Sequence, residues 1–115
     1  MNSKVEETKK KNDKIAAIVS VAASEFFKRE SDRTSMITVT RTEIKDRSKK
    51  ALIYITVFPE DKEETALSFT KRKRTELHNY LINETGLVMV PFVDIEIDIG
   101  EKNRQKIEAI KLDIK

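Results

Sequence analysis

Two groups of closely spaced lysine and arginine side chains are the residues of this chain best suited to binding a ligand. Five cations lie between residues 41 and 50, interrupted by two acids, and four more follow one another at residues 71–74. The members are Arg41, Lys45, Arg47, Lys49, Lys50, Lys71, Arg72, Lys73 and Arg74. Clusters of this kind bind phosphates and other anions. These nine residues are the candidate anion-binding site, although a run such as that at residues 71–74 is by itself more often only a solvated helix face.

Other chemistry has less support. His78 is the only histidine and the chain has no cysteine, so no nucleophilic triad, thiolate site or histidine metal site is indicated. Asp94, Glu96 and Asp98 alternate and could hold a hard cation, but alternating carboxylates usually form the solvent side of a strand. Tyr54 could stack on a base, but within an apolar run it is more often a partly buried sheet residue. We predict no catalytic residue, no metal and no cofactor.

The elements that position these side chains can be read from hydrophobic periodicity. Residues 37–44 and 51–57 alternate and are rich in β-branched residues, which predicts a hairpin. Residues 14–29 predict a helix with one apolar face, which covers the sheet. Residues 61–82 predict either one bent helix or two shorter ones, because the four cations interrupt the apolar stripe. Residues 93–99 predict a third strand.

This order of elements predicts an α+β fold with helices on one face of a three-stranded mixed sheet. A helical crossover lets the third strand run parallel to a member of the hairpin. A last helix is predicted from about residue 101 to residue 114. We expect a flexible basic arm over residues 1–13, a domain over residues 14–100 and a C-terminal helical extension over residues 101–115.

Composition limits the setting of the protein. With 115 residues, 38% apolar and 37% charged, the chain suits one small domain, and we expect a monomer. The absence of cysteine favours a reducing compartment, so a cytoplasmic protein is expected. No apolar run approaches the ~20 residues that a membrane span needs, and the N-terminus is charged where a signal peptide is apolar. We therefore expect no membrane partner.

The order helix, strand, strand, helix, helix, strand is that of type II K-homology domains, which clamp nucleic acid with a G-x-x-G loop between the two helices. The only glycines, Gly86 and Gly100, cannot form that loop. The hairpin at residues 36–57 resembles, without gaps, that of the ribosome-binding factor A family, and residues 90–95 resemble the start of its last strand. Further matches are Ala66, Leu67, Leu77, Leu81 and the pair Lys106-Ile107. The resemblance spans residues 14–111.

Several positions depart from the family pattern. The family has an Ala-x-Gly kink between its helices, whereas Lys73, Arg74 and Thr75 occupy those positions here. The hairpin turn at residues 45–48 lacks the family's Ser-x-Asp-Leu, and Arg104 replaces a C-terminal glycine. The chain therefore resembles a divergent member.

The resemblance implies a non-enzymatic factor that binds the small ribosomal subunit late in its maturation, near the decoding region, and assists processing and folding of its rRNA. The nine cations are then the RNA-binding residues, on the hairpin tip and the helical side. Two alternatives stay open: a stand-alone RNA-binding or ribosome-inactivating module of K-homology type, and a protein–protein adaptor that uses the acidic sheet face. An enzyme has the least support.

Overall fold

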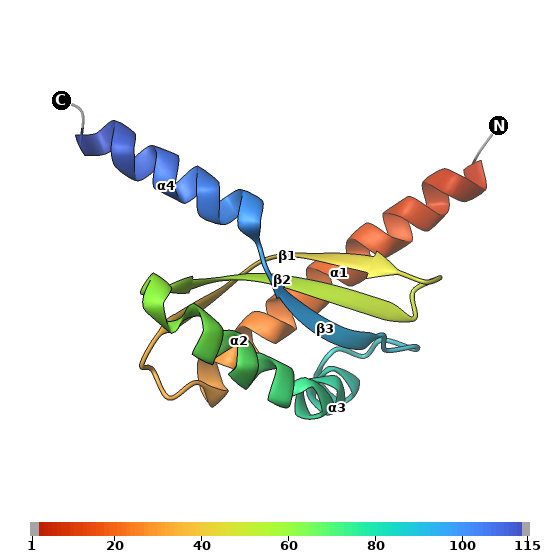
Figure 1. Ribbon diagram of the computed structural model, residues 1–115. Helices are drawn as coiled ribbons and strands as arrows, with labels where there is room; N and C mark the ends of the chain where they lie inside the picture. Colours follow the sequence, from red (N-terminus) through yellow and green to blue (C-terminus); the bar gives the residue numbers. More distant parts are fainter. Residues whose placement is uncertain (1–2, 114–115) are drawn as a thin grey trace.

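The predicted order of elements is confirmed by the structure, a computed structural model that describes residues 3–113. Three helices cover one face of the sheet, and a fourth projects away from it (Figure 1). The helices are α1 (Ser3–Glu30), α2 (Glu63–Arg72), α3 (Arg74–Glu84) and α4 (Ile99–Asp113), with a 3₁₀ turn η1 (Glu60–Lys62) before α2. The strands are β1 (Met36–Lys45), β2 (Lys50–Phe58) and β3 (Phe92–Ile97).

The sheet is mixed, as predicted. β1 pairs with β2 antiparallel, and β3 pairs with β2 in parallel, in the order β1-β2-β3. The helices α2 and α3 provide the crossover that a parallel pair requires. In this register Lys50 lies opposite Phe92, and the N–H of Phe92 donates to the carbonyl of Lys49 at 2.9 Å. β3 therefore begins directly beside the hairpin turn.

The core forms between α1, α3 and the inner face of the sheet. Val19 and Phe27 of α1, Leu77 of α3, and Ile53 and Ile95 of the strands are fully buried together. Burying a side chain of this size contributes about 1.5–3 kcal/mol. The helix face predicted for α1 is the one that packs on the sheet, so this cluster holds α1 and α3 in place.

A β-bulge at Thr40 changes which residues of β1 face the core. The pairing shifts between Val39 and Arg41, and Thr40 has no partner on β2. Ile37 and Val39 pack against the core before the bulge, and Ile44 does so after it. An uninterrupted strand would turn Ile44 outward, because side chains alternate with a period of two. The change from odd to even apolar positions is the sequence signal for this bulge.

The helix α1 begins earlier than predicted. Its backbone is helical from Ser3, although a flexible arm was expected over residues 1–13. Lysine and glutamate favour helix, and no glycine or proline interrupts this stretch. Residues 1 and 2 lie outside the described residues, and the division into arm, domain and extension stays a prediction.

The region after the hairpin forms two helices, which was one of the two predicted possibilities. Lys73 separates α2 from α3, with φ −93° and ψ 7°. The last helix, α4, also forms as predicted, although its expected final residue Ile114 lies outside the described residues.

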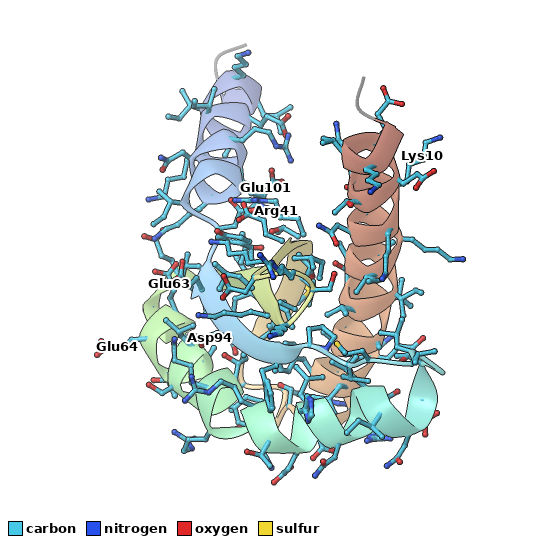
Figure 2. All side chains as sticks on the ribbon, turned by 90° about the vertical axis from the view of Figure 1, so that its right-hand side faces the viewer. Lys10, Arg41, Glu63, Glu64, Asp94 and Glu101 are labelled. Carbon is cyan, nitrogen blue, oxygen red and sulfur yellow. The ribbon has the colours of Figure 1, made fainter. Side chains whose placement is uncertain are left out.

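Asp98 connects α4 to the bulge in β1. One carboxylate oxygen accepts from the N–H of Glu101 at 3.0 Å and so caps the helix. The other accepts from the hydroxyl of Thr40 at 2.6 Å and from Nε of Arg41 at 3.3 Å. Figure 2 shows Arg41 and Glu101 close together at the base of α4. Asp98 is buried, so the expectation that it forms part of an open acidic sheet face is wrong.

The contacts of Asp98 predict a pH-dependent contribution to stability. Burial raises the pKa of Asp98, but the hydrogen bonds from Thr40 and Glu101 and the charge of Arg41 outweigh it, so the pKa is lowered. A carboxyl with a lowered folded-state pKa stabilises the protein above its unfolded value of about 3.9, and the stabilisation is lost as the pH falls through the folded value. Asp98→Ala should lower the free energy of unfolding at neutral pH by about 1–3 kcal/mol.

Urea unfolding at neutral pH and at several values between about pH 2 and pH 5 measures this effect. The control is Asp61→Ala, which removes an exposed carboxylate from η1. Asp98→Ala should flatten the acid limb of the stability curve and the control should not. Equal curves for the two variants would contradict the role given to Asp98.

Candidate nucleic-acid interface

The structure distributes the nine predicted cations over three places. Arg47, Lys49 and Lys50 lie at the hairpin turn, exposed, and make no ion pair with any residue in the range 3–113. Lys45 lies next to them at the end of β1, and its Nζ is 3.7 Å from a carboxylate oxygen of Glu43. The turn therefore carries a group of three cations without carboxylate partners, which we call the turn cations.

The backbone, not ion pairing, holds the turn cations. Asp46, Arg47 and Ser48 have φ values of 53°, 57° and 69°, in the left-handed region that costs an L-residue roughly 1–2 kcal/mol. The N–H of Lys49 donates to the carbonyl of Asp46 at 3.1 Å, and the hydroxyl of Ser48 donates to the side-chain oxygen of Asn12 at 3.0 Å. These two bonds close the turn and attach it to α1, which leaves the cationic side chains facing solvent.

The four consecutive cations at the α2–α3 junction are mostly neutralised. Lys71 Nζ and Arg74 Nη1 lie 3.1 and 3.2 Å from one oxygen of Asp94. Lys73 Nζ lies 3.1 Å from Glu76 and 3.8 Å from Glu30. The exposed Arg72 is the only one of the four without an ion pair to a residue that the structure describes. Three of the cations therefore join the junction to β3 and to α1.

Asp94 is the acid that competes with any anion for Lys71 and Arg74. It lies on β3 where this strand faces α2 (Figure 2). Burial raises the pKa of Asp94, but the N–H of Ile95 and the two cations outweigh burial, so the pKa is lowered. Asp94 is thus ionised at neutral pH. A phosphate that binds Lys71 or Arg74 competes with this carboxylate for their charge.

Arg41 lies apart from both groups, on the outer face of the sheet. Its guanidinium lies over the ring of Tyr54, 3.8 Å from the ring centre, and it pairs with Asp98 and Glu43. The hydrogen bond to Glu43 is the largest cause of the raised pKa of Arg41, and the charge of Asp98 adds to it, whereas burial acts in the opposite direction. Tyr54 is half-buried, as predicted for a sheet residue. Arg41 therefore connects β1 to α4 in this structure.

Phe92 is the residue that the sequence reasoning missed. The residue is 70% exposed, it is paired in register with Lys50, and its ring stacks on that of His78. A signal for it was present in the sequence. Phe92 has the same alternation phase as Asp94 and Glu96, so an aromatic residue occupies the polar phase of the strand.

Two further searches of residues 3–113 were negative. No helix there is long and apolar enough to cross a membrane. No three acidic, histidine or cysteine side chains are grouped so that they could hold a metal ion.

Comparison with solved structures identifies the fold. Ribosome-binding factor A from Thermus thermophilus matches with a TM-score of 0.66 at 20% identity, over 75% of this chain and 94% of that one. A homology model of the T. thermophilus factor, fitted into a cryo-EM map of a 30S–ribosome-binding factor A complex, matches with a TM-score of 0.62 at 21% identity, over 70% and 88%. A Thermotoga maritima protein, provisionally named a ribosome-binding factor A, gives 0.51 at 16% identity, over 74% and 80%.

No protein-family model and no curated protein sequence matches the chain. The agreement is therefore one of structure at low sequence identity. The chain has the fold of ribosome-binding factor A.

Asp94→Asn tests the neutralised state of the junction. Loss of the carboxylate removes partners from Lys71 and Arg74, which are partly exposed, so the free energy of unfolding should fall by only about 1 kcal/mol. The two released cations should raise the salt concentration at which the protein elutes from heparin. The matched control is Glu96→Gln, which makes the same charge change at an exposed residue of β3. Equal elution of the two variants would contradict the competition by Asp94.

Proposed function

We propose that this protein is an assembly factor that binds the small ribosomal subunit late in its maturation and assists processing and folding of its rRNA. The observation that carries the proposal is the fold shared with ribosome-binding factor A, which extends over 94% of the T. thermophilus protein. The neighbour fitted into a 30S complex supports the small subunit as the partner. The turn cations add a surface suited to phosphates.

The protein acts in this proposal through binding energy alone. Arg47, Lys49 and Lys50 contact phosphates directly, because no carboxylate of the described chain has to be displaced from them. Arg72 adds a contact from the junction, while at Lys71 and Arg74 the rRNA competes with Asp94. A factor that binds one conformation of rRNA more tightly shifts the population toward it by that difference in affinity. No bond is made or broken by the protein.

A function as a protein–protein adaptor has little support. It needs an acidic sheet face, but Asp94 is paired with Lys71 and Arg74, and Asp98 is buried at the base of α4. Among Asp94, Glu96 and Asp98, only Glu96 is exposed. A partner that recognises acidic groups would find little free negative charge there.

Co-sedimentation with ribosomal particles tests the proposal. The purified protein is mixed with immature and mature small subunits, large subunits and intact ribosomes, each at low and at near-physiological salt. We expect salt-sensitive association with small subunits, strongest with the immature form. Equal binding to every particle would favour a stand-alone RNA-binding module, and no binding at low salt would overturn the proposal.

Charge reversal at the turn tests its surface. Lys49→Glu with Lys50→Glu should abolish association at near-physiological salt, because two phosphate contacts are replaced by repulsion. The matched control is Lys28→Glu with Lys62→Glu, which reverses two exposed lysines away from the turn, in the last turn of α1 and in η1. Equal losses in the two double variants would mean that overall charge, not this surface, drives binding.

A further inference from the structure

An exposed aromatic ring beside unpaired cations is not explained by the fold. We propose that Phe92 is a stacking site for an unpaired nucleobase of single-stranded RNA, whose adjacent phosphates bind Lys49 and Lys50. This inference rests on the proposed function and deepens it, because it adds the form of RNA that the turn recognises. It also gives a role to Phe92, whose uncharged ring cannot take part in ion pairs.

The geometry of Phe92 prepares one ring face for a ligand. The rings of Phe92 and His78 are stacked, with centroids 4.8 Å apart and planes inclined by 11°. The Nε2 atom of His78 lies 3.4 Å from the carbonyl oxygen of Val90, to which it donates in the tautomer that carries a proton on Nε2. Phe92 is nevertheless 70% exposed. Because one face is supported by His78, a base that stacks on the other face continues an existing stack.

Phe92 lies next to two of the turn cations. Its N–H donates to the carbonyl of Lys49, and its partner in the β2–β3 register is Lys50. Neighbouring strands lie about 4.8 Å apart, so the backbone of Phe92 is adjacent to that of Lys49 and Lys50. A nucleotide whose base lies on Phe92 therefore has its phosphates within reach of flexible lysine side chains.

The local charge favours nucleic acid over protein. Asp94, two residues along β3, is occupied by Lys71 and Arg74, and Asp46 is the one acid within the turn itself. Exposed Val88 and Met89, from the loop before β3, add apolar surface to this part of the chain. Lysine is depleted at protein interfaces, whereas aromatic rings among cations are the common platform for single-stranded RNA. Bases within a duplex are already stacked, so the strand must be unpaired.

A tryptophan reporter tests stacking directly, because the chain has no tryptophan of its own. Phe92→Trp is titrated with an eight-nucleotide mixed-sequence RNA, single-stranded or as a duplex. We expect saturable quenching of fluorescence by the single strand and much less by the duplex. The matched control is Phe58→Trp, at an equally exposed residue whose register partner Met36 lies at the end of the hairpin remote from the turn. Equal quenching at both positions would overturn the inference.

Affinity measurements separate stacking from charge. Phe92→Ala and Phe92→Leu should each weaken binding of the single strand by roughly tenfold or more, while the dependence of log K on log salt keeps its slope. Lys49→Gln with Lys50→Gln should instead reduce the slope by about 1.4, since each lost phosphate contact contributes about 0.7 for single strands. Full affinity in Phe92→Leu would overturn stacking, because leucine keeps apolar area without an aromatic face.

The co-sedimentation experiment makes the two proposals separable. A wild-type protein that binds small subunits but not the single strand overturns the stacking site and leaves the proposed function standing. Loss of subunit binding in Phe92→Ala without quenching in Phe92→Trp by the single strand would assign Phe92 to a protein contact, which also overturns it. Thermal unfolding of each variant excludes loss of fold as the cause.

Discussion

The parallel pairing of β3 with β2 is the constraint on which the remaining structure depends. Its register places Phe92 beside the hairpin turn, Asp94 beside the α2–α3 junction and Asp98 beside the bulge in β1. Two residues of β3 and the residue that follows its end thus organise three parts of the molecule. The inward residues between them, Val93 and Ile95, fix the register because they are buried in the core. A slip by one residue would expose both.

At the α2–α3 junction the same cations would serve both the fold and a bound anion, whereas at the hairpin turn they would not. At the junction, Lys71 and Arg74 stabilise the crossover through their ion pairs with Asp94, which partly neutralise their charge. At the turn, the backbone is left-handed and Arg47 makes no ion pair with a carboxylate of the described chain. Strain of this kind is kept where the surrounding bonds determine it. The turn is therefore one surface whose cations make no ion pair within the described chain, and it is the surface that we propose for a polyanion.

The elements could be predicted from the sequence because each carries its own periodicity, and the parallel strand followed from the helical crossover. The interactions between elements could not. The pairing of Asp94 with Lys71, and the burial of Asp98 under Thr40, join residues 23 and 58 positions apart. The run at residues 71–74 was predicted from its charge to bind anions as one unit. Tertiary contacts leave only Arg72 of this run unpaired within the described chain. Phe92 and the bulge at Thr40 were not predicted, although each has a local signal in the sequence. These signals are an aromatic residue in the polar phase of β3 and the change from odd to even apolar positions in β1.

Lysine modification of the small-subunit complex, read by mass spectrometry, tests the central claim most directly. The exposed lysines of the free protein are labelled with an amine-reactive reagent, and the labelling is repeated with subunits bound. The account predicts strong protection of Lys49 and Lys50, with unchanged labelling of Lys28 and Lys62, which lie away from the turn in α1 and η1. Protection of Lys28 and Lys62 while Lys49 and Lys50 stay fully reactive would contradict it.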